Sequence, residues 1–108
     1  MKKGEIWIVE IPGLGGHEQE GRRPCIVIAD TRTSVSIIIP CTANLQALRF
    51  PYTLRLNASQ SSGLATTSVA LVLQLRALDK KRLMQKIGML EKPYLEEINR
   101  ALKKLLLL

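Results

Sequence analysis

Short apolar runs, most of them rich in Ile and Val, are separated by polar turns over much of the chain. β-Branched and aromatic side chains favour extended structure, so runs of this length predict strands. In residues 50–56 the apolar and polar positions alternate, which is typical of a half-exposed antiparallel strand. The predicted strands span residues 4–11, 24–30, 34–42, 50–56 and 68–76, and residues 85–90 return to extended structure.

The end of the chain carries a helical pattern instead. Its apolar residues recur at spacings of three and four, which gives one apolar stripe on a helix, and Pro93 suits the first turn. Asp79 can cap a short helical turn over residues 80–84. The stripe consists of Leu95, Ile98, Leu102 and Leu105. About six short strands and one helix predict an α+β, mainly β fold, in which the helix covers a small, strongly curled antiparallel sheet or barrel.

Composition agrees with one globular domain. The chain has 108 residues, of which 46% are hydrophobic and 23% charged, and these fractions argue against a disordered or fibrous protein. No apolar run approaches the ~20 residues that cross a bilayer. Glu5 and Glu10 interrupt the apolar stretch that a signal peptide would need. We therefore expect a cytoplasmic protein.

The balance of charges points to a class of partner. Sixteen Lys and Arg against nine Asp and Glu give a net charge of +7, which favours a polyanion such as a nucleic acid, or an acidic protein. Charge alone does not decide between the two. Cys25 and Cys41 lie in apolar runs without further ligands at metal spacing, so we expect buried reduced thiols rather than a zinc site or a disulfide.

The segment GHEQEGRRP, residues 16–24, gathers titratable side chains between two apolar strands. It holds the only histidine, His17, and two arginines, of which Arg23 has its backbone held extended by the following proline. A guanidinium fixed in this way can bind two phosphate oxygens. A solvated hairpin loop, with the arginines paired to Glu18 or Glu20, explains the same residues. A P-loop or a dinucleotide-binding loop does not explain them, because the segment lacks the GK[ST] ending of the first and the glycine spacing of the second.

Polar residues at the ends of two other strands can line the same cleft. Thr42 ends one of them, in the segment PCTAN, and Leu73, Gln74 and Arg76 end the other. Taken alone, Thr42 is explained by the β-propensity of threonine. These residues describe a small basic β domain with a polar, arginine-bearing loop, and no reaction follows from them.

The order of the segments resembles the MazF/PemK/Kid family of toxin–antitoxin ribonucleases. The resemblance covers nearly the whole chain and rests on KGEIWIVEI at the start, GHEQEGRRPCIVIAD, PCTAN, LQLRALDKKRL followed by KIGML, and the closing helix. The block G-[SH]-E-Q-x-G-x-R-P is the most distinctive of these. The resemblance implies that residues 1–108 are a single MazF/PemK-like toxin domain, folded as an SH3-like barrel of short antiparallel strands with a C-terminal helix.

The resemblance also implies an activity and partners. Members typically cut single-stranded RNA, including mRNA, at short sequence motifs without a metal ion, leaving a 2′,3′-cyclic phosphate and a 5′-hydroxyl. They form homodimers and are silenced by an acidic antitoxin protein that occupies the same groove as the RNA. We therefore expect a sequence-specific, metal-independent endoribonuclease toxin with no cofactor and no membrane partner.

Site residues follow from the same resemblance, position by position. Arg23 matches the catalytic arginine, Thr42 the catalytic threonine, and His17 a histidine that some members use and others replace by serine. An unperturbed pKa of about 6.5 suits His17 to proton transfer in either direction. The candidate RNA-binding residues are Glu18, Gln19, Arg22, Asn44, Gln74 and Arg76.

One position departs from the family pattern. Leu73 stands where the family usually has Asp or Glu, an acid–base group in some members, and a leucine side chain transfers no proton. We expect Arg23, Thr42 and His17 to carry more of the catalysis, with Glu18 as a substitute base. The alternatives are a weak or inactive module of the same fold that binds RNA or antitoxin, and a poison of a DNA topoisomerase, since a related toxin family shares the barrel.

Overall fold

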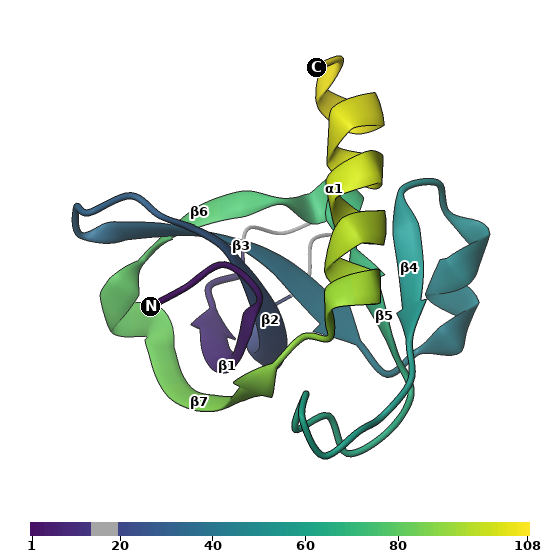
Figure 1. The fold of residues 1–108 in the computed structure, drawn as a ribbon. Helices are drawn as coiled ribbons and strands as arrows, with labels where there is room; N and C mark the ends of the chain where they lie inside the picture. The colour runs from purple at the N-terminus through teal and green to yellow at the C-terminus, as the bar shows by residue number, and fades with distance from the viewer. Residues whose placement is uncertain (14–19) are drawn as a thin grey trace.

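A strongly curled antiparallel sheet and one C-terminal helix make up the fold (Figure 1). The computed structural model describes residues 1–13 and 20–108. Neighbouring strands follow the order β4–β5–β3–β2–β1–β7, and β6 pairs with β3 outside this path. The elements are β1 (Glu5–Ile11), β2 (Gly21–Asp30), β3 (Val35–Thr42), β4 (Thr53–Leu56), β5 (Ser68–Leu71), β6 (Arg76–Asp79), β7 (Leu83–Met89) and α1 (Lys92–Leu106). The expected α+β, mainly β fold is therefore confirmed.

Strand β3 connects the parts of the sheet. It pairs with β6 and β2 along most of its length, whereas its last residues, Cys41 and Thr42, pair with β5. The last pair between β2 and β3 joins Cys25 to Pro40. Beyond this pair the two strands part, because β2 continues beside β1 as far as Gly21 while β3 continues beside β5. The candidate site lies at this divergence.

Apolar side chains pack on both faces of the sheet, as expected for a covered sheet. One cluster joins the sheet to α1 and contains Ile26, Ile98 and Leu102. Alternate residues of the same strands, among them Val27 and Ile38, form a second cluster on the opposite face. Full burial of each such side chain contributes about 1.5–3 kcal/mol. The predicted apolar stripe of the helix is therefore confirmed.

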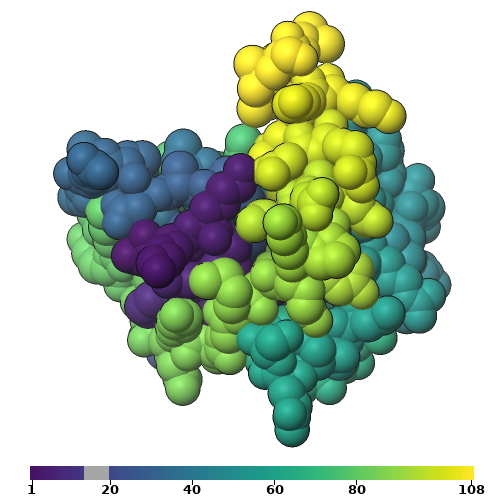
Figure 2. All heavy atoms as spheres, viewed as in Figure 1, coloured from purple at the N-terminus to yellow at the C-terminus, as the bar shows by residue number. Residues whose placement is uncertain are grey.

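The C-terminal end of α1 projects beyond the body of the molecule (Figure 2). Leu107 and Leu108 are 91% and 85% exposed, and Leu106 is also exposed. The described residues thus leave an apolar end of the chain uncovered. No helix in residues 1–13 and 20–108 is long and apolar enough to cross a membrane.

The strand predicted over residues 50–56 is shorter than its pattern suggests. It begins only at Thr53, because Leu45–Arg49 form a 3-10 helix, η1, and Tyr52 has a positive φ of 55°. A residue in the left-handed region cannot continue a strand. The alternation of apolar and polar residues was therefore misleading in its first half.

The strand predicted over residues 68–76 is interrupted. Val72–Gln74 form a short 3-10 helix, η2, so that β5 pairs with β4 and β3 while β6 returns to another part of β3. The apolar run continues through the turn because Val72 of η2 is buried, while Leu73 is exposed. Composition alone could not reveal this break.

Two other boundaries differ by a few residues. Strand β2 begins at Gly21 instead of residue 24, so Arg22 and Arg23 belong to the strand and pair with β1. The predicted cap at Asp79 is confirmed, since its carboxylate accepts a hydrogen bond from the backbone N–H of Lys81 at 3.0 Å. The helical turn itself, η3, spans Lys80–Arg82, because β7 starts at the next residue.

Candidate functional site

Thr42 lies at the end of β3, where β3 has left β2 and joined β5. The residue is only 7% exposed. Its Oγ1 accepts a hydrogen bond from the backbone N–H of Asn44 at 3.2 Å. A hydroxyl that accepts from the backbone keeps its own O–H for a second acceptor. Thr42 is therefore held so that it can donate to a ligand beside it.

The same polar residues begin η1. Asn44 is its N-cap, and the Oδ1 atom of Asn44 accepts a hydrogen bond from the backbone N–H of Gln46 at 3.1 Å. At the other end, the backbone N–H of Phe50 donates to the carbonyl of Ala47 at 3.1 Å. Asn is a favoured N-cap residue because its side chain satisfies an otherwise unpaired backbone N–H. These bonds fix η1 directly after Thr42.

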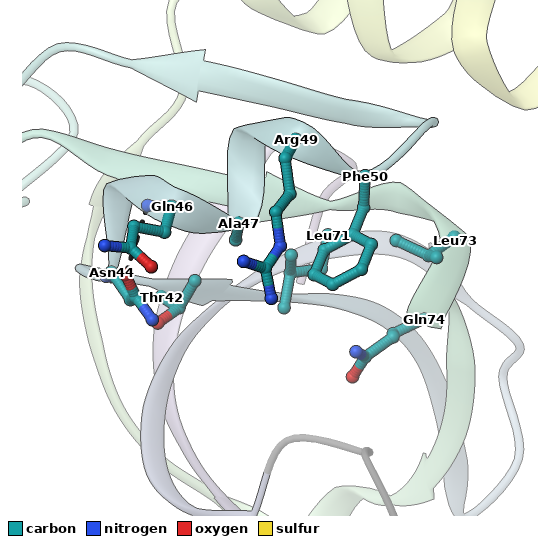
Figure 3. A pocket seen from close by; sticks show the side chains of 9 residues that line it. All are labelled: Thr42, Asn44, Gln46, Ala47, Arg49, Phe50, Leu71, Leu73 and Gln74. Atoms are coloured by element: carbon teal, nitrogen blue, oxygen red, sulfur yellow. Dashed lines mark hydrogen bonds between the residues drawn. The ribbon is translucent and has the colours of Figure 1, made fainter.

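A groove with a volume of about 510 Å³ opens beside Thr42, between η1 and η2 (Figure 3). This volume lies in the range of small-ligand sites. Among the lining residues, which all belong to the described part of the chain, three are carboxamides, one is a cation and none is a carboxylate. They are Thr42, Asn44, Gln46, Ala47, Arg49, Phe50, Leu71, Leu73 and Gln74.

Arg23 lies on β2, two residues before Cys25, and Thr42 lies two residues after Pro40, so both follow the last pair between β2 and β3. There Arg23 pairs with Val9 of β1 and Thr42 with Val69 of β5, and Arg23 is not among the residues that line the groove. The Nε atom of Arg23 donates to the carbonyl of Glu20 at 3.1 Å, which leaves the terminal Nη groups of the half-buried side chain for a ligand. A guanidinium anchored in this way presents a fixed fork of donors.

The other predicted arginines lie outside the groove. Arg22 forms an exposed ion pair with Glu10, with 3.8 Å between Nε and Oε2; the expected partners for such a surface pair were Glu18 and Glu20. Arg76 is half-buried on β6, opposite Ile38 of β3. Exposed pairs of this kind contribute little to stability.

Three of the predicted residues fall in the part of the chain that is not described. His17, Glu18 and Gln19 lie outside residues 1–13 and 20–108. Of the predicted residues that are described, Thr42, Asn44 and Gln74 line the groove, and Arg23 lies on β2 beyond its last pair with β3.

Both cysteines are free and buried, as expected. Burial raises the pKa of Cys25 to about 12, an effect that the positive charge of Arg76 partly opposes. Burial also raises the pKa of Cys41. Among the described residues, no three His, Cys, Asp or Glu side chains are grouped to hold a metal ion.

Apart from Asn44, the residues on the η1 side of the groove were not predicted from the sequence. Arg49 and Phe50 line it, with the Arg49 guanidinium 4.9 Å from the centre of the Phe50 ring. A useful signal was present, because Asn44 is a good helix cap and Pro51 a helix terminator. The run between them was too short and irregular to predict a helix from periodicity.

Comparison with known proteins gives one family over nearly the whole chain. Residues 2–106 match the model of the PemK-like, MazF-like toxin of type II toxin–antitoxin system. The chain is 29% identical over 112 residues to Endoribonuclease MazF9 of Mycobacterium tuberculosis, covering 95% of this chain and 93% of the relative. It is 30% identical over 107 residues to Endoribonuclease EndoA of Bacillus subtilis, covering 95% and 91%.

Solved structures show the same fold. A crystal structure of MazF (Form-I) from Deinococcus radiodurans superposes with a TM-score of 0.84 at 24% identity, covering 100% of this chain and 97% of that one. The MazE–MazF structure (Form-II) from the same organism has a TM-score of 0.76 at 25% identity, covering 98% and 95%.

Proposed function

The chain belongs to the PemK-like, MazF-like family of type II toxins, and on this premise we propose that it is a sequence-specific endoribonuclease that cuts single-stranded RNA, including mRNA. We further propose that it needs no metal ion or other cofactor and leaves 2′,3′-cyclic phosphate and 5′-hydroxyl ends. Relatives with 29% and 30% identity carry the name endoribonuclease, which supports the reaction class. Residues 1–108 are then one toxin domain that acts in the cytoplasm.

The observation that carries the proposal is the placement of two donors, Arg23 and Thr42, on the two strands that part at the Cys25–Pro40 pair, each two residues beyond it. Attack by the 2′-oxygen forms its bond to phosphorus as the bond from phosphorus to the 5′-oxygen breaks. The intermediate state carries extra negative charge on the phosphate oxygens. Donors aimed at this charge stabilise the transition state more than the ground state. The Nη groups of Arg23 and the hydroxyl of Thr42 are donors of this kind.

The reaction also moves two protons. The 2′-hydroxyl loses one, and the departing 5′-oxygen gains one. We assign this transfer to His17, because an imidazole with a pKa of about 6.5 serves as base or acid near neutral pH. Glu18 is the substitute base. Cleavage by a His17→Asn variant should be slower than by wild type and should lose one limb of the pH–rate profile.

The remaining polar residues bind RNA in this proposal. Asn44 and Gln74 line the groove, and Arg22 and Arg76 add positive charge on β2 and β6. Gln19 completes the set with Glu18. Binding should weaken as salt rises, since contacts between cations and phosphates release counterions.

We also propose two protein partners. A MazF from Deinococcus radiodurans has been crystallised with MazE, and a mycobacterial endoribonuclease with its cognate antitoxin. The net charge of +7 fits an acidic antitoxin in the RNA groove. The exposed leucines at the end of α1 fit a homodimer, because an uncovered apolar end favours burial against a second chain. Equilibrium sedimentation that gives a monomer at micromolar concentration would refute the dimer.

The test is cleavage of a random-sequence RNA pool in EDTA, with the ends mapped and their phosphates identified. We expect cuts at one short motif, bearing a cyclic phosphate, and a loss of about 100-fold to 1000-fold in the Arg23→Ala variant. Arg55→Ala, which removes an exposed arginine of β4 that does not line the groove, is the control. Equal cleavage by wild type and Arg23→Ala, or dependence of both on added metal, would contradict the proposal.

Leu73 favours a second candidate function, a binding module with weak or no cleavage. The side chain is 39% exposed and lines the groove next to Gln74, and it cannot transfer a proton. Retention of RNA by a protein that cuts nothing would support this candidate. A gain of cleavage in a Leu73→Asp variant would identify the missing carboxylate as the cause.

A further inference from the structure

We propose that the groove beside Thr42 binds one unpaired nucleobase of the RNA, with Arg49 and Phe50 as its stacking platform. This inference rests on the proposed ribonuclease function and adds a subsite to it. It assigns a role to the η1 side of the groove, where the sequence predicted only Asn44.

The platform is visible in the geometry of two neighbouring side chains. Phe50 is 48% exposed, and the Arg49 guanidinium lies 4.9 Å from the centre of its ring. In Figure 3 the Arg49 side chain extends into the groove beside the Phe50 ring. An exposed aromatic ring paired with arginine can stack a base through its π-face while the cation meets the phosphate backbone.

The rest of the lining suits a neutral, flat ligand. Leu71 and Leu73 supply apolar walls, and Asn44, Gln46 and Gln74 supply carboxamides, with no carboxylate among the lining residues described. The Oδ1 atom of Asn44 already accepts the capping hydrogen bond from Gln46. The amide N–H groups of Asn44 are therefore the donors that this side chain can offer a ligand. A base edge with acceptor atoms fits this arrangement.

The platform is held in place before the ligand arrives. Cap bonds fix both ends of η1, and the backbone N–H of Leu73 donates to the carbonyl of Tyr52 at 3.2 Å. This bond ties η2 to the residues that follow η1. Because the two walls are joined through the backbone, little ordering is needed when a base enters.

The position of the subsite follows from Thr42. This residue lines the groove and is also the proposed donor to the scissile phosphate. A base bound there belongs to a nucleotide that flanks the cut, and the platform holds this base against the carboxamides that can read its edge. Loss of one stacking contact weakens binding by about 5-fold to 150-fold.

The first experiment compares kcat/KM and base preference on a cleavable RNA library. We expect Phe50→Ala to lower kcat/KM by about 5-fold to 150-fold, to relax the preference at one position beside the cut, and to leave the products unchanged. Phe50→Trp should retain both. Arg49→Ala should weaken binding and reduce its salt dependence.

Two variants provide matched controls. Leu48→Ala removes an exposed apolar side chain of η1, and Arg55→Ala removes an exposed arginine of β4; neither residue lines the groove. Both should cleave like wild type. The same losses in these controls would overturn the subsite, because the effect would then come from η1 folding or from general charge.

The second experiment detects stacking directly and does not need cleavage. A DNA oligonucleotide with 2-aminopurine at successive positions reports stacking by fluorescence quenching. We expect quenching at one position in wild type and its loss in Phe50→Ala. If the protein cuts no RNA in the first experiment but quenches the DNA probe in the second, the ribonuclease function is refuted and the subsite stands. If the protein cuts RNA and Phe50→Ala changes neither cleavage nor quenching, the subsite alone is refuted. The subsite is also refuted if Phe50→Ala and Arg49→Ala impair only the binding of an acidic antitoxin peptide.

Discussion

Replacing Thr42 by valine removes a hydroxyl while keeping the shape of the side chain. The hydroxyl oxygen accepts the Asn44 backbone N–H at 3.2 Å in a position that is only 7% exposed. In the valine variant this N–H loses its partner, which costs about 0.5–1.5 kcal/mol, because Asn44 is exposed and water can replace the hydroxyl. No cavity forms, because the branched side chain is retained. We therefore expect a stability loss in this range from the hydrogen bond alone.

The effect on catalysis should be larger than the effect on stability. Loss of one donor to a charged transition state costs about 100-fold to 1000-fold in kcat, or roughly 3–4 kcal/mol. Thr42→Ser keeps the hydroxyl and removes a methyl group, so it should retain most of the activity. Comparing the activities of the Val and Ser variants separates the effect of the lost hydroxyl from the effect of the lost methyl group.

The assay measures kcat and KM for one RNA, with urea unfolding of the same preparations. Both variants must be folded at the assay temperature. We expect valine to lower kcat with a small change in KM, which is the signature of an interaction made in the transition state. A folded Thr42→Val variant with kcat within threefold of wild type would refute the assignment of Thr42 as a donor.

Three further predictions concern the scaffold. Asp30→Asn removes a carboxylate whose pKa is lowered from 3.8 to about 2, mainly by its hydrogen bond from Lys80. The stability that this carboxylate contributes is complete above pH 3.8 and is lost as the pH falls through about 2. Urea unfolding curves of wild type and variant should therefore converge near pH 2. Cys25 and Cys41 are fully buried, so iodoacetamide at pH 8 should label them only after unfolding, and labelling of the native protein would contradict their burial. Gly88→Ala places a Cβ 2.3 Å from the backbone of Ser62, and we expect a loss of about 1–3 kcal/mol or more in urea unfolding; an unchanged midpoint would contradict this close approach.

Much of the fold could be predicted because its patterns are local. The period of the final helix and the β-branched runs of the first strands depend on neighbouring residues, and the structure confirms both. The two errors, over residues 50–56 and 68–76, arose where the chain changes direction. At Tyr52 and at Val72–Gln74 the local composition still favours a strand. The backbone departs from it because Tyr52 has a positive φ before β4 and because the chain passes at η2 from β5 to β6, which pairs with another part of β3.

The polar residues at strand ends could be predicted as parts of the site, but the full set of groove residues could not. The sequence identified Thr42 as a strand end, yet the point at which β2 and β3 part, two residues from both Arg23 and Thr42, depends on pairing between strands. Arg49 and Phe50 had no signal of their own, because their role depends on how η1 folds back beside Thr42. Their spacing from Arg23 along the chain gives no hint of a shared site.

The most direct test of the central claim is the effect of a single 2′-deoxy substitution in the RNA. The substituted nucleotide is the one immediately before the mapped cut. If the 2′-oxygen attacks the phosphate with Arg23 and Thr42 as donors, the deoxy substrate should bind with similar affinity and remain uncut at that bond. Cleavage of the deoxy substrate at the rate of the ribo substrate would contradict the proposed reaction.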